Sequence, residues 1–346
     1  MLKRFLHSIC FFMGLGAFSF QACSTPPHSH ETVTKQDFDF KEIQRQLANE
    51  GLVVEVHSAV AQYGLYVATY RDRENFFNYV HMSMITRDQE LKKVLSSLQR
   101  HDKIRITGKF ADNDSPQKHI KLSNIEVLKK YEPTPGLPKH DYPENIPEEL
   151  KAKNSARFLV HAVHADGKIL VLEYKEMVVP IFVTRNELSR DLYRNDKIIL
   201  NYVIQENPGR PTHLELDPNV ENPIEVFDRI EDQNEKMATL QGELILFPKS
   251  PQVSFDVWAL LQTDEFGIKT NYTIVNFEDM DKFKAIRDKM AAAWAKDPQN
   301  FVSGRNKLVH NKIEVKARGR LNVVDPNQAN PQIMLDSADD LEIIVK

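Results

Sequence analysis

The side chains best suited to chemistry in this sequence are aromatic and basic, and they cluster between residues 66 and 81. Two runs, 65–70 and 76–85, alternate with the period of two typical of β-strands, and a polar hairpin with Arg71 and Arg73 joins them. We assign the apolar positions of these runs to a buried inner face, namely Leu65, Val67, Val80, Met82 and Met84. The other face then carries Tyr66, Tyr70, Phe77, Tyr79 and His81. Aromatic rings beside arginines stack on the bases of single-stranded nucleic acids, and they also bind sugars and peptides.

The same aromatic residues could instead cover the sheet or an interface with a neighbouring part of the chain, because aromatic side chains favour strands for packing reasons alone. Local charge supports the binding hypothesis. The whole chain has a formal net charge of −4, but residues 51–130 come to +4, whereas residues 151–230 and 231–346 come to −1 and −3. An anionic ligand is therefore expected to bind the first of these segments.

Motifs for catalysis, cofactors and metals are missing from the sequence. It contains no glycine-rich phosphate loop, no nucleophile elbow, no His-Glu-x-x-His helix and no Cys/His metal spacing. His161 and His164 would point to opposite faces of a strand, and His28 and His30 lie in a polar segment where such a pair is usually solvated. We therefore predict a protein that is not an enzyme and holds no metal or cofactor.

The elements that position these residues repeat three times along the chain. A polar turn with a lysine precedes an apolar run at His101–Ile106, Asn195–Leu200 and His310–Val315. A further strand pattern follows each run and ends in an apolar-Glu-apolar triplet, at residues 125–127, 224–226 and 341–343. Three extended runs and a segment of helical spacing precede each turn, the helical segment being short in the second copy, at 187–194. The order strand, strand, strand, helix, strand, strand thus occurs three times.

This order is that of the OB-fold, a five-stranded, partly open barrel whose helix lies between the third and fourth strands. Each copy resembles the tRNA-anticodon-binding-like OB-fold family, which includes bacterial lipoproteins, and the likeness rests chiefly on residues 102–108 and 120–127. Only the first copy keeps a glycine, Gly108, after the fourth strand. The resemblance implies a mainly β fold of three tandem five-stranded OB-like barrels, each with a helix between strands three and four. OB-folds bind ligands on the face of strands two and three, which here carries the aromatic residues.

The beginning of the chain resembles a bacterial lipoprotein signal. A basic start is followed by an apolar stretch, 5–20, that is shorter than a transmembrane helix needs. Residues 20–23, Phe-Gln-Ala-Cys, are similar to a lipobox, with Phe20 where leucine is usual. The resemblance implies cleavage before Cys23, lipidation of that cysteine, and sorting to the outer membrane through Ser24. Because Cys10 would leave with the signal, the mature chain would have no other thiol.

These features predict the domain organisation: a signal peptide at 1–22, lipidated Cys23 with a tether at 23–50, barrels at 51–130, 151–230 and 231–346, and a linker at 131–150 with five prolines. The shorter, acidic junction after the second barrel predicts that the last two barrels are less independent of each other. We expect a protein anchored by lipid in the outer membrane, facing the periplasm or alternatively the cell surface. It would recognise an extended polymer such as a glycan or a peptide, or a protein partner. The alternatives are a structural spacer in an outer-membrane assembly and binding of single-stranded nucleic acid, of which the periplasm normally contains little.

Overall fold

The computed structural model describes residues 38–346, apart from 72–78, 113–117, 136, 138–144, 165–166, 207–211, 252, 254, 299, 305 and 324–328. The predicted signal peptide and Cys23 lie outside the described residues. The chain divides between Glu132 and Pro133 into two compact units, and each is described by itself. No helix in the described part of the chain is long and apolar enough to cross a membrane.

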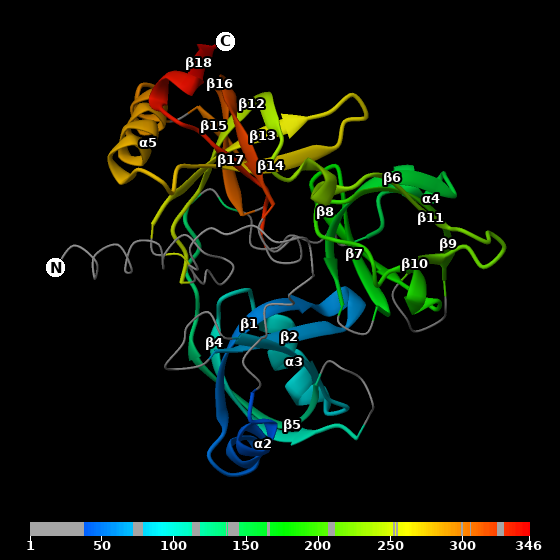
Figure 1. Ribbon diagram of the computed structural model, residues 1–346. Helices are drawn as coiled ribbons and strands as arrows, with labels where there is room; N and C mark the ends of the chain where they lie inside the picture. Colours follow the sequence, from blue (N-terminus) through cyan, green and yellow to red (C-terminus); the bar gives the residue numbers. More distant parts are fainter. Residues whose placement is uncertain are drawn as a thin grey trace, which may run out of the picture. The chain divides into compact units, whose positions relative to one another are not determined.

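The first unit is a closed β-barrel (Figure 1). Its elements are α2 (Phe40–Asn49), β1 (Leu52–Val60), η1 (Ala61–Tyr63), β2 (Leu65–Arg71), β3 (Tyr79–Ile85), α3 (Gln89–Ser97), β4 (Lys103–Phe110) and β5 (His119–Lys129). The strands close in the order β1-β2-β3-β5-β4, since β4 also pairs with β1. β3 and β5 run parallel, and the other neighbours are antiparallel. This is the predicted OB order, with α3 between the third and fourth strands.

The helix α2 corrects the predicted tether, 23–50, because its residues pack on the first barrel. Ile43 and Leu47, four residues apart on one helix face, are buried in the barrel core. The Asp39 side chain caps the helix, and the side chain of Gln44 accepts a hydrogen bond from a backbone N–H of β4 (2.8 Å). The barrel therefore begins before residue 51. Two buried apolar residues in a short polar helix are too few to give a visible period in the sequence.

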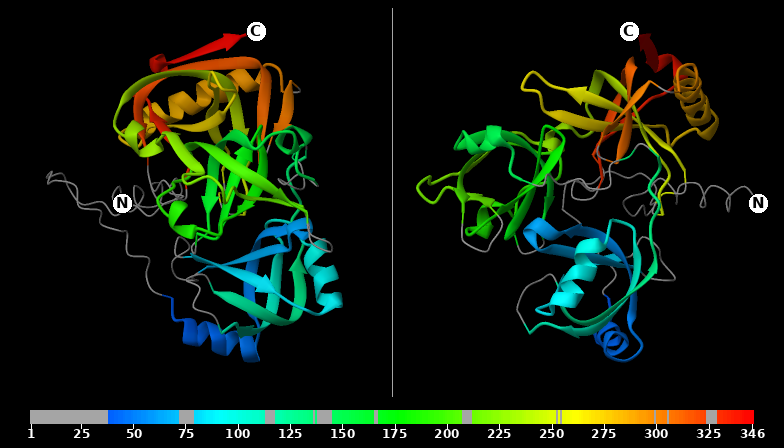
Figure 2. Two further views of the ribbon diagram at one scale, coloured as in Figure 1. Left: turned by 90° about the vertical axis from the view of Figure 1, so that its right-hand side faces the viewer. Right: turned by 180° about the vertical axis from the view of Figure 1, so that it is seen from behind.

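The second unit contains two further barrels (Figures 1 and 2). One is built from β6 (Ser155–Val163), β7 (Ile169–Tyr174), β8 (Met177–Phe182), β9 (Lys197–Gln205), β10 (His213–Leu216) and β11 (Ile224–Asp228), and α4 (Glu148–Lys151) precedes it. The other contains β12 (Met237–Phe247), β13 (Val257–Thr263), β14 (Lys269–Val275), α5 (Met280–Ala295), β15 (Phe301–Gly304), β16 (Lys307–Asn322), β17 (Gln332–Met334) and β18 (Leu341–Val345). The 3-10 turns are η2 (Asn186–Leu188), η3 (Ile230–Gln233) and η4 (Ala338–Asp340).

Both of these barrels close in the same order as the first. The rings are β6-β7-β8-β10-β9 and β12-β13-β14-β17-β16, and in each the third and fifth strands pair in parallel. The predicted mainly β fold of three tandem OB-like barrels is therefore confirmed. α5 lies against the third barrel, where it buries Phe283, Ile286, Met290 and Trp294 (Figure 2).

The barrels differ in three details from the predicted repeat. The fifth strand is continuous in β5 but split into β10 and β11, and into β17 and β18, so the second and third apolar-Glu-apolar triplets belong to β11 and β18. In the second barrel η2 takes the place of the predicted helix, because the segment before β9 is too short for several helical turns. Gly108 also has a counterpart, Gly319 in β16. At both positions a Cβ would lie 2.2 Å from a carbonyl oxygen of the fifth strand, that of Lys121 or Met334.

A buried aspartate fastens the fourth strand of the first barrel. Asp102 is 0% exposed and its Oδ1 accepts a hydrogen bond from the N–H of Tyr131 (2.8 Å), just beyond β5. Its Oδ2 accepts from the N–H of Gln99 (3.0 Å) and from the Nζ of Lys130 (2.8 Å). The entry of β4 is thereby tied to the exit of β5.

The backbone beside this aspartate fixes the first strand as well. His101 has a φ of 70°, and its N–H donates to the carbonyl of Val56 (2.8 Å). The N–H of Val56 in turn donates to the carbonyl of Asp102 (2.8 Å), and β1 bulges at the next residue, His57. We call the set Val56, His57, Arg100, His101 and Asp102 the aspartate corner.

The second barrel repeats the aspartate corner. Asp196 accepts hydrogen bonds from the N–H groups of Tyr193 (2.9 Å) and Ile230 (3.0 Å), and it lies 3.4 Å from the Nη1 of Arg229. The two backbone hydrogen bonds recur at 2.7 and 2.8 Å, and β6 bulges at the corresponding position. The counterparts of the corner residues are Val160, His161, Arg194, Asn195 and Asp196. In the third barrel the matching position is Asn311, which is exposed.

Removing the carboxylate of the first corner should loosen that barrel alone. We expect Asp102→Ala to destabilise it by about 3 kcal/mol, because two backbone N–H groups lose their acceptor. Hydrogen exchange of the full chain should show faster exchange of the β1 and β4 amides, with the amides of the second unit unchanged. Asn311→Ala is the matched control and should alter neither. Unchanged protection of β4 in Asp102→Ala would contradict this role.

The second and third barrels are joined by partly buried ion pairs. Glu176, in the turn between β7 and β8, contacts the Nζ atoms of Lys269 (2.7 Å) and Lys307 (2.9 Å) in the third barrel. The side chain of Lys307 is only 1% exposed and also donates to Oδ1 of Asn271 (3.0 Å). Lys197 of β9 pairs with Asp264 of the third barrel (2.9 Å). The last two barrels thus share one compact unit, as their acidic junction predicts.

The turn that carries Glu176 is strained. Lys175 and Glu176 form a two-residue hairpin turn with φ angles of 47° and 66°, a conformation usually taken by asparagine and glycine. Such backbone persists where surrounding contacts hold it. Here the contacts are ion pairs, of Lys175 with Glu149 and of Glu176 with Lys269 and Lys307.

Breaking the Glu176 contact should destabilise the second unit. We expect Glu176→Ala to lower its free energy of unfolding by about 3 kcal/mol, because the ammonium of Lys307 stays buried without a carboxylate. Urea unfolding followed by tryptophan fluorescence measures the change, since Trp258 and Trp294 both lie in the third barrel core. The double variant Glu176→Leu/Lys307→Met should recover most of the loss. Glu225→Ala, at an exposed glutamate of β11, should have no effect.

Acid should weaken the same contact. Burial alone would raise the pKa of Glu176, but Lys307 and Lys269 outweigh burial and hold it below its ordinary value of 4.5. Its stabilising contribution is therefore complete above pH 4.5 and is lost as the pH falls through the lowered pKa. In Glu176→Ala this part of the acid dependence of unfolding should disappear.

Candidate binding face of the first barrel

The register of β2 and β3 divides the predicted binding residues between two faces. Ala68 pairs with Met82 and Tyr70 with Val80, so the tyrosines of β2 share the core side. Thr69 pairs with His81 and Arg71 with Tyr79, and these four residues share the outer side. The predicted face for Val80, Met82 and Met84 is correct, whereas that for Leu65, Val67, Tyr66 and Tyr70 is wrong. Alternation within one strand does not say which of its faces meets which face of the next strand.

Tyr66 and Tyr70 therefore have structural contacts. Both pack against the core of the barrel. The hydroxyl of Tyr66 lies 3.0 Å from the Oγ of Ser96 in α3, and the ring of Tyr70 meets that of Phe38 edge-on, with centroids 6.0 Å apart. These contacts attach α3 and the start of the first barrel to β2.

Arg71, Tyr79 and His81 do meet on the outer face, and His57 joins them. The guanidinium carbon of Arg71 lies 5.0 Å from the ring centroid of Tyr79, which lies 5.2 Å from that of His81. His81 is 4.2 Å from His57, centroid to centroid, and its Nδ1 lies 3.0 Å from the Oγ1 of Thr69. These five residues form a continuous row across β1, β2 and β3, and we call it the outer row. Two further predicted residues, Arg73 and Phe77, lie outside the described residues.

Sequence reasoning missed the part of this face that belongs to the aspartate corner. His101 pairs through Nδ1 with Oε1 of Glu55 (2.8 Å), and its ring meets that of Tyr131 edge-on at 5.0 Å. Glu55 faces Thr69 across the strands. His57 sits on a β-bulge, where strict alternation fails, so no period could have placed it. The repeated polar turn at His101–Ile106 is the one sequence feature that could have pointed to His101.

Several basic groups surround His57 in the outer row. Burial lowers the pKa of His57 well below its ordinary value of 6.5, and the neighbouring basic groups of His81, Arg100, His101 and Arg71 lower it further. The Nδ1 of His57 is buried and has no hydrogen-bond partner among the described residues. Burial also lowers the pKa of Arg71, although Glu55 and Tyr79 act in the opposite direction. Basic groups and flat rings in one row can bind an acidic group and stack on its surroundings.

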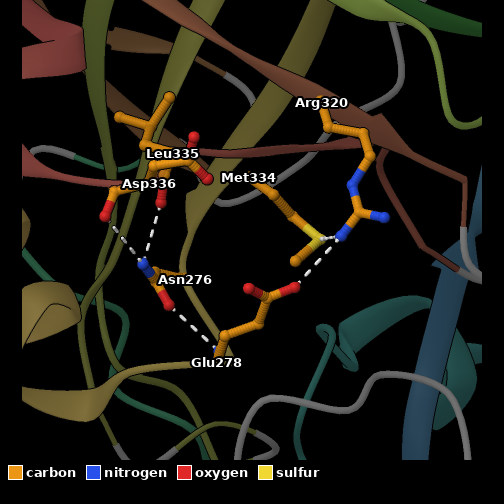
Figure 3. Close-up of a pocket in the computed structure, with 6 residues that line it drawn as sticks. All are labelled: Asn276, Glu278, Arg320, Met334, Leu335 and Asp336. Carbon is orange, nitrogen blue, oxygen red and sulfur yellow. Dashed lines mark hydrogen bonds and ion pairs between the residues drawn. The ribbon is translucent and has the colours of Figure 1, made fainter.

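A small hollow near the ends of β14 and β17 is a structural joint. It has a volume of about 20 Å³, enough for one water molecule (Figure 3). The side-chain amide of Asn276 donates to the carbonyl of Leu335 (2.9 Å), and its Oδ1 accepts from the N–H of Glu278 (3.0 Å). Arg320 in turn pairs with Glu278 (3.2 Å). These bonds hold the two strand ends together.

A larger cleft, of about 550 Å³, lies between β6 and the turn that joins β13 to β14. Its size suits a small ligand. Several of its charged side chains already have partners, however. Lys269 binds Glu176, and the guanidinium of Arg157 lies 4.3 Å from the ring centroid of Phe266. We assign this cleft to the contact between the second and third barrels. Among the described residues no group of three or more His, Cys, Asp or Glu could hold a metal ion.

Comparison with known proteins identifies no relative by sequence. No protein-family model matches the chain, and no curated protein matches it. The solved structures that are similar include a murine DNA-binding protein bound to double-stranded DNA, 16% identical over 49% of this chain and 94% of its own, with a TM-score of 0.18. The Ifi202 HINa domain, in complex with 20-bp double-stranded DNA, is 12% identical over 53% of this chain and 98% of its own, with a TM-score of 0.19. Drosophila Unr CSD456 is 10% identical over 86% of this chain and 97% of its own, with a TM-score of 0.16.

TM-scores this low carry no argument about function. The OB-like assignment rests instead on the strand order and on the parallel pairing of the third and fifth strands in each barrel.

Proposed function

We propose that the protein is a non-catalytic binding protein, anchored by lipid on Cys23 in the bacterial outer membrane, and that its first barrel recognises an acidic extended polymer or a protein partner. The observation that carries the proposal is the outer row, in which Arg71, Tyr79, His81 and His57 follow one another at 4.2 to 5.2 Å. Strands two and three of an OB-fold are its usual ligand face.

The chemistry of the outer row suits an acidic ligand. Arginine and imidazole groups pair with carboxylates or phosphates, while the rings of Tyr79 and His81 provide flat apolar surface for stacking. One carboxylate, Glu55, lies beside the row, and it already binds His101. The first segment is also the one with a net positive charge, +4 for residues 51–130.

A structural spacer is the second candidate, and the burial of the outer row favours it. Thr69 is 1% exposed, and the other four residues are half-buried. A face that protein covers in an assembly would have this burial. Single-stranded nucleic acid could use the same stacking chemistry, so oligonucleotides belong in the binding test, although an outer-membrane location would keep the protein away from most of it.

Lipid anchoring can be tested at the cysteine itself. Cys23→Ala should yield a precursor that takes up no radiolabelled palmitate, because its lipobox no longer contains the cysteine that carries the lipid. Metabolic labelling of the intact cell shows the result. Cys10→Ala is the matched control and should be labelled like the natural chain. Label on Cys23→Ala would contradict the anchor and the localisation that depends on it.

Recognition by the outer row can be tested by titrating the full chain with oligogalacturonate, an acidic peptide pool and dT oligonucleotides. Tyr79→Ala should weaken binding of the preferred probe by about 1 to 3 kcal/mol, the value of a lost stacking contact. Arg71→Ala should also reduce the salt dependence of binding, since it removes a charge that salt screens. Arg318→Ala, at an exposed arginine of β16, is the control and should bind normally.

The spacer makes the opposite forecast for these variants. If no probe binds, and Tyr79→Ala and Arg71→Ala only reduce the hydrogen-exchange protection of the first barrel, the recognition proposal fails. Tyr70→Ala should reduce that protection under either proposal, because Tyr70 packs against the core.

A further inference from the structure

The second barrel uses its aspartate corner to hold a segment of the third barrel. The Nη2 of Arg194 donates to the Oδ1 of Asn330 (3.0 Å), and the Nδ2 of Asn195 donates to the carbonyl of Ala329 (3.3 Å). Asn195 and Ala329 are 5% and 9% exposed, so the contact is buried. The segment held in this way is the one that leads into β17. The corner therefore binds polypeptide, through one backbone carbonyl and one side-chain amide oxygen.

The outer face beside this corner takes part in the same contact. Glu176, at the end of β7 and β8, reaches Lys269 and Lys307 of the third barrel. Leu159 and Val178, which alternate with core residues of β6 and β8, are 3% and 1% exposed although they lie outside the barrel core. In the second barrel, the corner and the outer face of strands one to three together form a surface that binds another protein domain.

The first barrel presents the same surface with different charges. Arg100 and His101 stand where the second barrel has Arg194 and Asn195, and the same backbone bonds and the same bulge hold them. The strand registers show that Thr69 and His81 correspond to Glu173 and Val178. Where the second barrel has an acidic and an apolar residue, the first therefore has a hydroxyl and an imidazole.

We propose that the aspartate corner and outer row of the first barrel bind an acidic loop of a protein partner, in the way that the second barrel binds residues 329–330. The inference rests on the proposed function and names its partner. Arg100 and His101 would donate to carbonyl and carboxylate oxygens of the loop, as their counterparts do to Ala329 and Asn330. The second barrel meets the lysines of its partner with the carboxylate of Glu176, and at that position the first barrel has Tyr79. Without this carboxylate, and with Arg71 and His81 beside Tyr79, the first barrel favours an acidic loop.

The test uses the full chain labelled in its histidines and a cyclic peptide with the sequence of residues 321–334, alone and with Asn330→Asp. The peptides should shift the imidazole NMR signals of His57 and His101, and Asn330→Asp should bind more tightly, by about threefold or more, because it adds a charge opposite the arginines. Arg100→Ala should weaken the acidic peptide about tenfold. Arg318→Ala should bind it as the natural chain does, and hydrogen exchange of β4 confirms that Arg100→Ala is folded.

The outcomes separate the two proposals. Binding of oligogalacturonate or dT oligonucleotides through Arg71 and Tyr79, with no binding of either peptide, overturns the protein partner and leaves the recognition function standing. Equal binding of the peptides by Arg100→Ala overturns the role of the corner. Failure of every probe overturns both. Arg194→Ala tests whether the corner of the second barrel holds residues 329–330. It should speed hydrogen exchange of the β17 amides, and unchanged exchange would remove the basis for comparing the two corners.

Discussion

The buried carboxylate before the fourth strand is the contact on which the first two barrels depend. In the first barrel it joins backbone groups that lie 32 residues apart, those of Gln99 and Tyr131, and so closes the last strand onto the ring. Beside this carboxylate, the N–H of His101 and the carbonyl of Asp102 bind the carbonyl and the N–H of Val56. These two hydrogen bonds fix the register of β1, which bulges at the next residue, His57. The bulge turns His57 out of the alternating pattern and places it against His81. The candidate binding face is thus a consequence of how the barrel closes.

In the second barrel this contact fixes geometry more than it adds stability. Burial raises the pKa of Asp196, and the hydrogen bonds from Tyr193 and Ile230 and the charge of Arg229 offset that effect only in part. The charged form is therefore less favourable in the folded barrel than in water. An apolar residue would avoid this cost but could accept no hydrogen bond from the two backbone groups. The gain is a defined register for strands one and four, on which the position of every outer side chain depends.

The strand order could be predicted because alternating apolar residues mark each strand and because the same order of elements recurs in all three repeats. The face of each side chain could not. Tyr66 and Tyr70 alternate correctly with their neighbours, yet only the pairing of Ala68 with Met82 shows that they face the core. α2 escaped prediction because it buries only Ile43 and Leu47. Of the predicted site, Arg71, Tyr79 and His81 lie together, whereas His57 and His101 depend on a bulge and a buried aspartate that leave no pattern in the sequence.

Three barrels of one topology use equivalent surfaces differently, and charge accounts for the difference. The second barrel carries Glu176 on a strained turn, and this carboxylate pairs with Lys269 and Lys307 of the third barrel. The third barrel also has a buried apolar patch outside its main core, formed by Ile245, Ala259, Leu261 and Val309. This pair is complementary and closes one compact unit. The outer row of the first barrel is basic, as the third barrel is at this contact with Lys269 and Lys307. Beside it the first barrel has an aspartate corner like that of the second barrel. A surface that combines donors for carbonyl oxygens with several basic groups is complementary to an acidic polypeptide. A neutral glycan lacks the charge for this contact, and a basic protein would be repelled.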